Sequence, residues 1–353
     1  MQIVVTAFLV LLALLAALVL FTRIFVLVIE RRHPPVGRFA TVNGTRLHYV
    51  LERAEGTADL PPVVFLHGAS GNLLDQMLAF RDRLAGRADL LFVDRPGHGW
   101  SARGPEYNEL PDGQADTIAA LLDELGIGKA IIAGHSFGGA IAASFALNHP
   151  GKTAGILFMA PVSHPWPGGV DWYYDLTPRP IIGRLFSETL VVPLGLLRLW
   201  PGTRAVFSPN PPARDFVRRT GVAMVLRPWH FRANAIDVAR LSEYVARTAP
   251  RYPRIKAPAV IITGDGDTIV LPRVHSMGLA RDLENAELVW VRNLGHKPDY
   301  VATDLAVAAL EKLAGKPRDL QALARQLEER IAEDRYGPVH RSLGNREAVP
   351  SDA

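Results

Sequence analysis

A serine set among glycines is the residue of this chain best placed for covalent chemistry. It lies in Gly134-His135-Ser136-Phe137-Gly138-Gly139, directly after the apolar run 129–133. A short β-branched run that ends in GxSxG is typical of a strand that turns sharply into a helix and lifts the serine hydroxyl clear of the backbone. Gly134 and Gly138 flank this strained turn, where a side chain would collide with a neighbouring element, and Gly139 lets the helix pack closely. Ser136 is therefore the candidate nucleophile.

A second glycine-containing segment lies upstream of the serine. Residues 62–66 predict a buried strand, and His67-Gly68-Ala69-Ser70-Gly71 follows it directly. In this pattern the sequence resembles the α/β-hydrolase superfamily, specifically its members with HGxxG after the third strand. The resemblance implies that the backbone N–H groups of Ala69 and Phe137 form an oxyanion hole. The loss of one such donor costs about 10²–10³ in rate in comparable sites.

The resemblance also assigns supporting residues around this loop. His67 braces the loop in such proteins, and Gly68 belongs to the same segment. Residues 90–101 predict a strand followed by a glycine-punctuated loop. We expect Asp94 and His98 to shape that loop through bonds to backbone amides.

An acid is expected after the strand that residues 259–263 predict. The chain continues there with Gly264-Asp265-Gly266-Asp267. The family pattern places the acid three positions after the first glycine, which selects Asp267. Asp265 is the competitor, and its side chain is better suited to capping the turn.

A histidine must follow the acid, on the loop after the last strand. Residues 287–291 predict that strand, and His296 comes after the turn that ends at Gly295. His296 would take the proton from Ser136 and return it to the leaving group, while Asp267 holds the imidazole tautomer. His275 stands too near the start of a helix to serve. His135 occupies the variable position of GxSxG, where we expect its side chain to point away from the serine hydroxyl.

Alternating strands and helices predict the fold that positions these groups. The expected helices are listed by residue number as 73–85, 112–125, 138–149, 273–283 and 298–313. Residues 39–42 and 47–50, joined through Asn43-Gly44, predict a β-hairpin. Together with the resemblance, this pattern predicts an α/β-hydrolase fold with a mostly parallel eight-stranded sheet and helices on both faces.

We expect six segments along the chain. They are a transmembrane anchor (1–30), a linker (31–37), a first core part (38–160), a helical cap (161–255), a second core part (256–315), and a C-terminal helix with a disordered tail (316–353). The final helix is predicted over 319–334, with an apolar stripe, and the polar composition after Gly337 predicts disorder.

The N-terminus is long and apolar enough to cross a membrane. From Ile3 to Thr22 it has 20 residues with only threonine as a polar interruption, which suffices for about 30 Å of hydrocarbon. A signal peptide would have a basic start, a shorter apolar core and a small-residue cleavage site. A buried soluble helix would have a polar face. We therefore expect a retained single-pass anchor, and Arg23, Arg31 and Arg32 on its C-terminal side favour a cytoplasmic catalytic domain.

The predicted cap is rich in aromatic residues, prolines and arginines. Residues 161–255 contain 13 arginines and no lysine against 6 acidic residues. This excess suits a surface held against anionic headgroups or attraction of acidic substrates. It is equally compatible with a solvated arginine-rich surface. The resemblance implies that the cap lies over the active site and shapes its pocket.

The composition excludes several kinds of chemical site. The chain has no cysteine, which excludes disulfides, thiolate nucleophiles and cysteine-based zinc sites. The sequence has no HExxH-like spacing and no nucleic-acid-binding motif. We expect no cofactor and no metal, and small-molecule or lipid esters as substrates.

The expected function is that of a membrane-anchored serine hydrolase that cleaves carboxylic esters, like an esterase or lipase. A serine rather than an aspartate nucleophile argues against an epoxide hydrolase or a dehalogenase. The alternatives on the same three residues are a C–C bond hydrolase and a cofactor-free perhydrolase or haloperoxidase-like enzyme. A non-enzymatic binding protein is a further alternative, against which the complete set Ser136, Asp267 and His296 argues.

Overall fold

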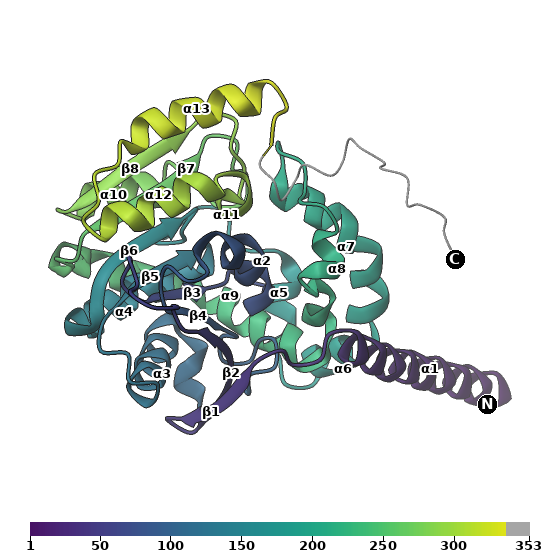
Figure 1. Cartoon of the computed structure of the whole chain (residues 1–353). Coiled ribbons are helices and arrows are strands. Elements are labelled where there is room, and N and C mark those ends of the chain that lie inside the picture. Colours follow the sequence, from purple (N-terminus) through teal and green to yellow (C-terminus); the bar gives the residue numbers. More distant parts are fainter. Residues whose placement is uncertain (337–353) are drawn as a thin grey trace, which may run out of the picture.

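The core of the protein is one twisted eight-stranded sheet, seen in a computed structural model that describes residues 1–336 (Figure 1). The strand order is β1-β2-β4-β3-β5-β6-β7-β8. The pairs β1–β2 and β2–β4 are antiparallel, and all remaining pairs are parallel. This is the α/β-hydrolase fold that the sequence predicts. The expected tail after Gly337 lies outside the described residues.

The strands are short and mostly buried along their whole length, as is usual for a parallel sheet covered on both faces. Their bounds are β1 Arg38–Val42, β2 Thr45–Glu52, β3 Val63–Leu66, β4 Leu90–Val93, β5 Ala130–His135, β6 Thr153–Met159, β7 Ala259–Gly264 and β8 Ala286–Val291.

Helices connect the strands and also form a long insertion between β6 and β7. The α-helices are α1 Gln2–Arg32, α2 Leu73–Leu84, α3 Pro111–Glu124, α4 Phe137–Asn148, α5 Trp172–Leu176, α6 Ile182–Thr189, α7 Val191–Phe207, α8 Phe216–Arg219, α9 Pro228–Thr248, α10 His275–Asp282, α11 Pro298–Val301, α12 Thr303–Leu313 and α13 Leu320–Ala332. The 3₁₀ helices are η1 Glu106–Glu109, η2 Pro150–Lys152, η3 Val222–Leu226 and η4 Ala249–Arg254.

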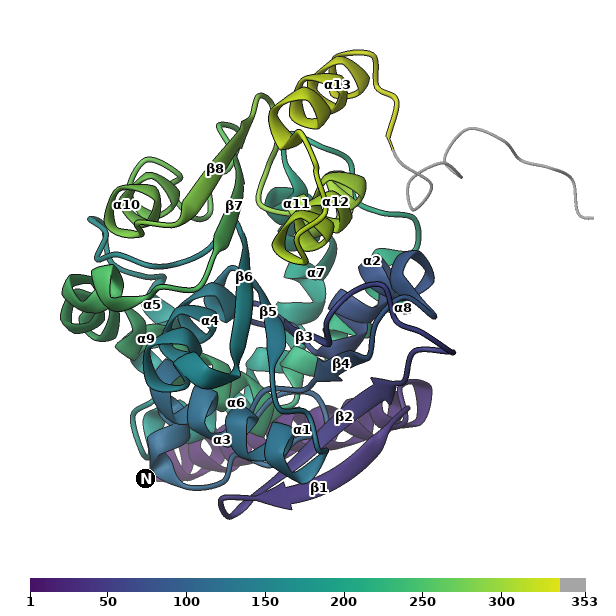
Figure 2. The ribbon, with the colours of Figure 1, turned by 60° about the vertical axis from the view of Figure 1, so that its left-hand side comes forward.

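Two layers of helices cover the sheet (Figure 2). On one face, α3, α4 and α10 pack against strand residues such as Val64 and Leu66. On the other face, α2, α12 and α13 pack against the alternate residues Val63 and Phe65. Successive side chains of a strand point to opposite faces, so each buried strand supplies both layers of the core.

Local turn chemistry explains the N-terminal hairpin. Asn43 and Gly44 both have positive φ, at 47° and 70°, which is the type I′ geometry that this dipeptide favours. The turn sets the register, with Val42 opposite Thr45. The hairpin therefore adds the antiparallel edge of the sheet as predicted.

Two predicted helices differ from those observed. The helix expected over 298–313 is interrupted at Ala302, whose φ of −111° and ψ of 28° are not helical. The Thr303 hydroxyl donates to the Asp299 carbonyl oxygen at 2.7 Å, which satisfies a helix-end acceptor at the break. The helix expected from 273 begins at His275 because residues 271–274 form a turn, in which Val274 donates to the Leu271 carbonyl.

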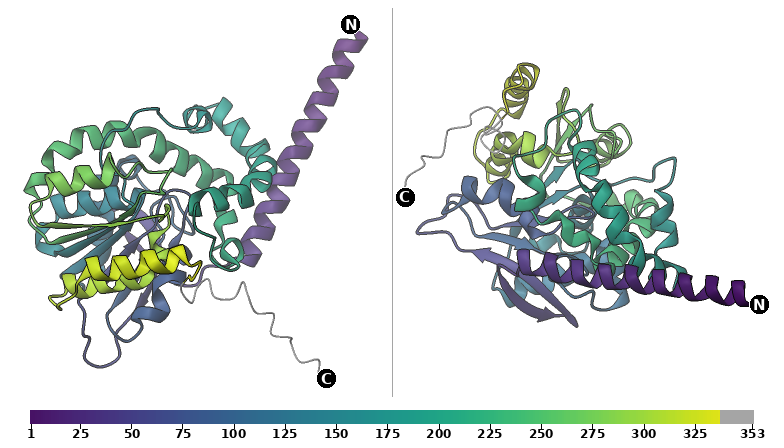
Figure 3. Two further views of the ribbon diagram at one scale, coloured as in Figure 1. Left: turned by 90° about the horizontal axis from the view of Figure 1, so that it is seen from above. Right: turned by 90° about the vertical axis from the view of Figure 1, so that its right-hand side faces the viewer.

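The first helix extends away from the body of the protein (Figures 1 and 3). α1 has 31 residues and would be about 46 Å long at 1.5 Å per residue. Among the described residues it is the one helix long and apolar enough to cross a membrane, and its most apolar window is wholly exposed. By these properties it could be an anchor or a signal sequence. Its last turns pack on the protein through Thr22, Val26 and Ile29.

The insertion between β6 and β7 is helical and lies beside α1 (Figure 3). We call residues 161–255 the cap segment. It holds α5 to α9 with η3 and η4. The division of the chain into anchor, core and cap units stays a prediction.

Buried histidines give the fold a dependence on pH. His67, His98, His135 and His230 are all buried. Burial lowers the pKa of each well below its ordinary value, and nearby cations lower it further: Arg95 beside His67 and His98, Lys297 beside His135, and Arg227 beside His230. The folded protein therefore keeps these rings neutral at pH values where the unfolded chain binds protons.

We predict that stability falls as the pH drops below about 6.5, the ordinary histidine pKa. Below that pH, each of these histidines lowers the free energy of unfolding by about 1.4 kcal/mol per pH unit, because only the unfolded state gains the proton. Urea unfolding midpoints of the detergent-solubilised protein between pH 8 and pH 5 measure this dependence. His98→Gln should reduce the slope, because it removes one of these buried rings. A midpoint that is constant from pH 7.5 to pH 5.5 would contradict the prediction.

Candidate active site

Ser136 occupies a strained turn between β5 and α4. Its backbone has φ 54° and ψ −117°, a conformation that costs about 1–3 kcal/mol for a residue with a side chain. Two hydrogen bonds to the end of β6 hold it there. The Ser136 N–H donates to the Met159 carbonyl at 3.0 Å, and the Val162 N–H donates to the Ser136 carbonyl at 3.0 Å. The neighbouring strand therefore fixes where the hydroxyl points.

The glycines around the serine leave no room for side chains. A Cβ at Gly134 would lie 2.3 Å from the Gly138 carbonyl oxygen, and one at Gly138 would lie 2.3 Å from the Leu66 carbonyl oxygen. A Cβ at Gly139 would lie 2.5 Å from Pro161 Cβ. The sharp turn thus depends on all three glycines.

The predicted acid, base and nucleophile meet in one hydrogen-bonded chain. Ser136 Oγ lies 3.0 Å from His296 Nε2, and His296 Nδ1 lies 2.7 Å from Asp267 Oδ2. The three residues are 8%, 3% and 3% exposed in the order Ser136, Asp267, His296. In this arrangement Nδ1 donates to the carboxylate and leaves Nε2 free to accept the serine proton.

Asp267 is held in its ionised form. Burial alone would raise the pKa of its carboxyl group, but His296 and the N–H groups of Val270 and Ile269 outweigh burial and lower the pKa below its ordinary value. Both N–H groups donate to Oδ1 at 2.9 Å. The other oxygen is thereby left to orient His296.

Asp265 and His275, the alternatives to Asp267 and His296, bind backbone groups elsewhere. Asp265 is exposed and accepts a hydrogen bond from the Asn293 N–H at 2.7 Å, so it caps the turn. His275 accepts from the N–H groups of Ser163 and His164 at 3.2 Å. Within residues 1–336, neither side chain forms a hydrogen bond with Ser136.

The HGxxG loop lies directly against the serine. A Cβ at Gly68 would lie 3.0 Å from Ser136 Cβ. Within residues 1–336, the N–H groups of Ala69 and Phe137 have no hydrogen-bond partner in the protein. The Phe137 N–H is also the first of α4, where helix N–H groups are unpaired and favour negative charge. Both N–H groups are thus unpaired within residues 1–336, and that of Phe137 directly follows Ser136 in the chain.

His67 braces this loop, which is the role the resemblance implies. Its Nε2 accepts from the Arg95 N–H at 3.1 Å and its Nδ1 donates to the Gly68 carbonyl at 2.9 Å. Asp94 accepts from the N–H groups of Leu73 and Trp100 at 2.7 and 2.8 Å. Both polar side chains therefore hold backbone in place.

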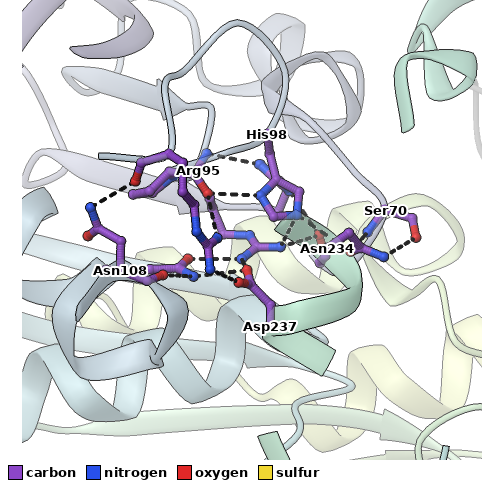
Figure 4. Close-up of polar contacts among 11 residues, drawn as sticks. Ser70, Arg95, His98, Asn108, Asn234 and Asp237 are labelled. Atoms are coloured by element: carbon purple, nitrogen blue, oxygen red, sulfur yellow. Dashed lines mark hydrogen bonds and ion pairs between the residues drawn. The ribbon is translucent and has the colours of Figure 1, made fainter. Parts of the chain in front are cut away.

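A buried polar network connects the HGxxG loop to the cap segment (Figure 4). Arg95 Nη1 donates to Asp237 Oδ2 of α9 at 3.1 Å, and Arg95 Nη2 donates to the Gly68 carbonyl at 3.3 Å. Burial lowers the pKa of Arg95 to about 10 although Asp237 opposes this shift, so the guanidinium remains charged at neutral pH. The Ser70 N–H donates to Asn234 Oδ1 of α9 at 2.7 Å. The loop that carries Ala69 is thus tied to the cap segment on both sides.

The sequence interpretation missed Arg95, Asn234, Asp237 and Tyr174. Tyr174 of α5 lies near Ser70 and Asn234, and burial raises the pKa of its hydroxyl. The partners in this network are far apart in sequence, and no motif contains Asn234 or Asp237.

A second buried charge cluster lies behind His296. Lys297 Nζ is 2.9 Å from both Asp75 Oδ2 and Asp299 Oδ2. His135 Nε2 donates to the backbone carbonyl of His296 at 2.8 Å. Ligand atoms of Asp75, His135 and Asp299 lie within 4.8 Å of one another, as in a metal site. The Lys297 ammonium already forms ion pairs with both carboxylates, so this cluster is better described as a support for the loop that carries His296.

Comparison with known proteins shows which family the chain resembles. The family model described as "Alpha/beta hydrolase family" matches residues 63–310. The 2-hydroxy-6-oxo-6-phenylhexa-2,4-dienoate hydrolase of Burkholderia cepacia is 23% identical over 285 residues, which cover 78% of this chain and 95% of that protein. The dihydrolipoyllysine-residue acetyltransferase component of the acetoin cleaving system of Cupriavidus necator is 36% identical over 125 residues. That match covers 35% of this chain and only 32% of the relative.

Solved structures share the fold. A thermophilic esterase from Thermogutta terrifontis aligns with a TM-score of 0.59 at 19% identity, covering 79% of this chain and 100% of that one. A bacterial membrane phospholipase A aligns with a TM-score of 0.56 at 21% identity, covering 84% of this chain and 93% of that one.

We predict that Asp267→Asn lowers kcat by about 10³–10⁴, because the amide neither selects the reactive tautomer nor stabilises the imidazolium. Steady-state hydrolysis of a p-nitrophenyl ester measures the effect. Asp265→Asn is the matched control and should change kcat less than about twofold, since Asp265 is exposed and does not contact His296. The reverse ranking of the two variants would show that the acid is assigned wrongly.

Proposed function

The chain belongs to the alpha/beta hydrolase family, and on this basis we propose that it is a serine hydrolase that cleaves carboxylic esters through an acyl-enzyme at Ser136. The observation that carries the proposal is the buried chain from Asp267 through His296 to Ser136, with contacts of 2.7 and 3.0 Å. The unpaired N–H groups of Ala69 and Phe137 belong to the two segments next to Ser136. Together these groups provide a base, a nucleophile and an anion site.

The geometry supports a two-step acyl transfer. His296 Nε2 takes the Ser136 proton as Oγ bonds to the ester carbonyl carbon. The Ala69 and Phe137 N–H groups stabilise the resulting oxyanion. When the intermediate collapses, the C–O bond to the alcohol breaks and His296 gives its proton to the departing oxygen. A water then attacks the acyl group with His296 again as base, and this step releases the acid and restores Ser136.

A C–C bond hydrolase is the second candidate. The Burkholderia cepacia relative, which matches over 95% of its length, is named as a hydrolase of 2-hydroxy-6-oxo-6-phenylhexa-2,4-dienoate. The same Ser136, His296 and Asp267 would serve such a reaction. A comparison of p-nitrophenyl esters with that dienoate separates the two candidates, because each predicts a kcat/KM higher for its own substrate.

We predict that a fluorophosphonate probe labels the wild-type protein and that Ser136→Ala and His296→Ala abolish labelling. The reason is that phosphonylation needs both the hydroxyl and the base that deprotonates it. In-gel fluorescence measures the result, and His275→Gln is the control that should keep the label. Absence of label on a folded wild-type protein would argue for a binding protein instead of an enzyme.

We further propose that α1 is a retained membrane anchor and that the catalytic domain lies in the cytoplasm. The exposed apolar stretch of α1 supports the anchor. Arg31 and Arg32 on its C-terminal side support the orientation. An anchored hydrolase with an aromatic cap segment suits apolar or lipid esters, and the fold shared with a membrane phospholipase A is consistent with such substrates.

We predict that protease added to intact cells leaves the catalytic domain undigested, since the domain lies behind the membrane. Immunoblotting measures protection, and detergent-permeabilised cells are the control in which digestion should occur. Digestion in intact cells would contradict the cytoplasmic orientation. A protein that lacks α1 and is released by carbonate washing would instead identify α1 as a signal sequence.

A further inference from the structure

The cap segment exposes an unusual number of large apolar side chains beside α1. We call them the apolar cap face, and they are Ile181, Ile182, Leu185, Leu194, Leu197 and Trp200. Ile181 is 82% exposed and Leu197 is 76% exposed. Leu194 and Leu197 follow one another on the same side of α7, and Ile182 and Leu185 do so on α6. These side chains lie on or next to two helices that contact each other, and exposed large apolar side chains gathered in this way mark an interaction surface.

The position of α1 identifies what this face meets. α1 contacts α6, α7 and η3 through its last turns, whereas its residues before Thr22 are almost all exposed. The first 20 apolar residues account for about 30 Å of hydrocarbon. The helix must therefore leave the bilayer near Arg23, which forms an ion pair of 2.8 Å with Glu188 at the end of α6. That contact puts α6 and the start of α7 at the membrane surface.

The direction of α1 is held firmly by the rest of the protein. Glu30 forms an ion pair with the buried Arg227 at 3.2 Å. Arg227 in turn donates to the Gly99 carbonyl, and Trp100 Nε1 donates to the carbonyl of His33 at 3.0 Å. These contacts fix the orientation of α1 relative to the rest of the protein. With α1 in a bilayer, α5 and α6 extend along it toward its N-terminus (Figure 3).

The charges around the face match a lipid surface. α7 contains no acidic residue, and the exposed arginines of α6 and α7 are Arg184, Arg198 and Arg204. Glu188, the acid on α6, is paired with Arg23. Arginines at the headgroup level attract anionic lipids, and tryptophans such as Trp200 favour the membrane interface.

We propose that the apolar cap face inserts into the interface of the same bilayer that holds α1. This inference rests on the proposed anchor and does not depend on the reaction. The occupant of the face is therefore the headgroup and upper acyl region of anionic lipid, and the face and α1 together fix the orientation of the catalytic domain. The cap segment also carries Asn234, which binds the HGxxG loop, so the active site has a fixed orientation to the membrane.

Site-specific fluorescence tests the proposal on the full chain. Because the chain has no cysteine, Leu12→Cys, Leu197→Cys and Gln326→Cys each accept a single nitrobenzoxadiazole label. The labelled proteins are reconstituted in vesicles of phosphatidylcholine and phosphatidylglycerol that carry nitroxide-labelled lipid. We expect at least a twofold loss of fluorescence at residues 12 and 197, and no loss at residue 326, which is exposed on α13.

The other outcomes are distinct. Quenching at residue 12 without quenching at residue 197 overturns the cap contact and leaves the anchor intact. A blue-shifted but unquenched label at residue 197 means that a second copy of the chain covers the face, and this also overturns the proposal. No quenching at residue 12 overturns both the anchor and the inference. A failure of ester hydrolysis affects none of these readings, since none of them uses catalysis.

A charge substitution provides a matched test. A label at Ile182→Cys should lose most of its quenching when Leu194→Glu and Leu197→Glu are added, because two carboxylates oppose insertion beside anionic lipid. Gln326→Glu should not change that quenching. An unchanged urea unfolding midpoint shows that the variants are folded. Quenching at residue 182 that persists in the double variant would contradict the proposal.

Discussion

The positive φ of Ser136 is the constraint on which the rest of the site depends. A serine at φ 54° and ψ −117° holds its hydroxyl above the carboxyl edge of the sheet, but an isolated turn would relax from this geometry. Hydrogen bonds to β6 on one side and close glycine contacts with α4 and β3 on the other prevent that relaxation. Contacts with β6, β3 and α4 thus stabilise the strained backbone of Ser136.

Every other candidate group is placed relative to that serine by the ends of parallel strands. Asp267 follows β7, His296 follows β8, and the loop with Ala69 follows β3, so their side chains and N–H groups converge at one edge of the sheet. Buried polar contacts then hold each loop in place: Arg95 and His67 for the HGxxG loop, and Lys297 for the loop of His296. The cap segment takes part in this support, because Asn234 and Asp237 on α9 are partners in the network.

Sequence reasoning reached the parts of the site that depend on local turn chemistry. The Asn43-Gly44 hairpin, the glycine turn at Ser136 and the position of His296 after β8 are each encoded within a few residues, so their patterns could be interpreted directly. The helix over 298–313 was only partly predicted, because the break at Ala302 comes with tertiary bonds of Lys297 and Tyr300 to Asp75. The network from Ser70 to Asn234 could not be predicted, since the two residues are 164 positions apart and Asn234 belongs to no motif. Whether Ser136, His296 and Asp267 act as proposed stays a prediction.

Intact-protein mass spectrometry during turnover tests the central claim most directly. Rapid acid quenching of the protein with a p-nitrophenyl ester should trap a fraction that is heavier by one acyl group, because a good leaving group makes the acyl-enzyme accumulate. Peptide mapping should then find the acyl group on Ser136, and the Ser136→Ala protein should carry none. An acyl group on another residue, or turnover without any acylated protein, would contradict the mechanism.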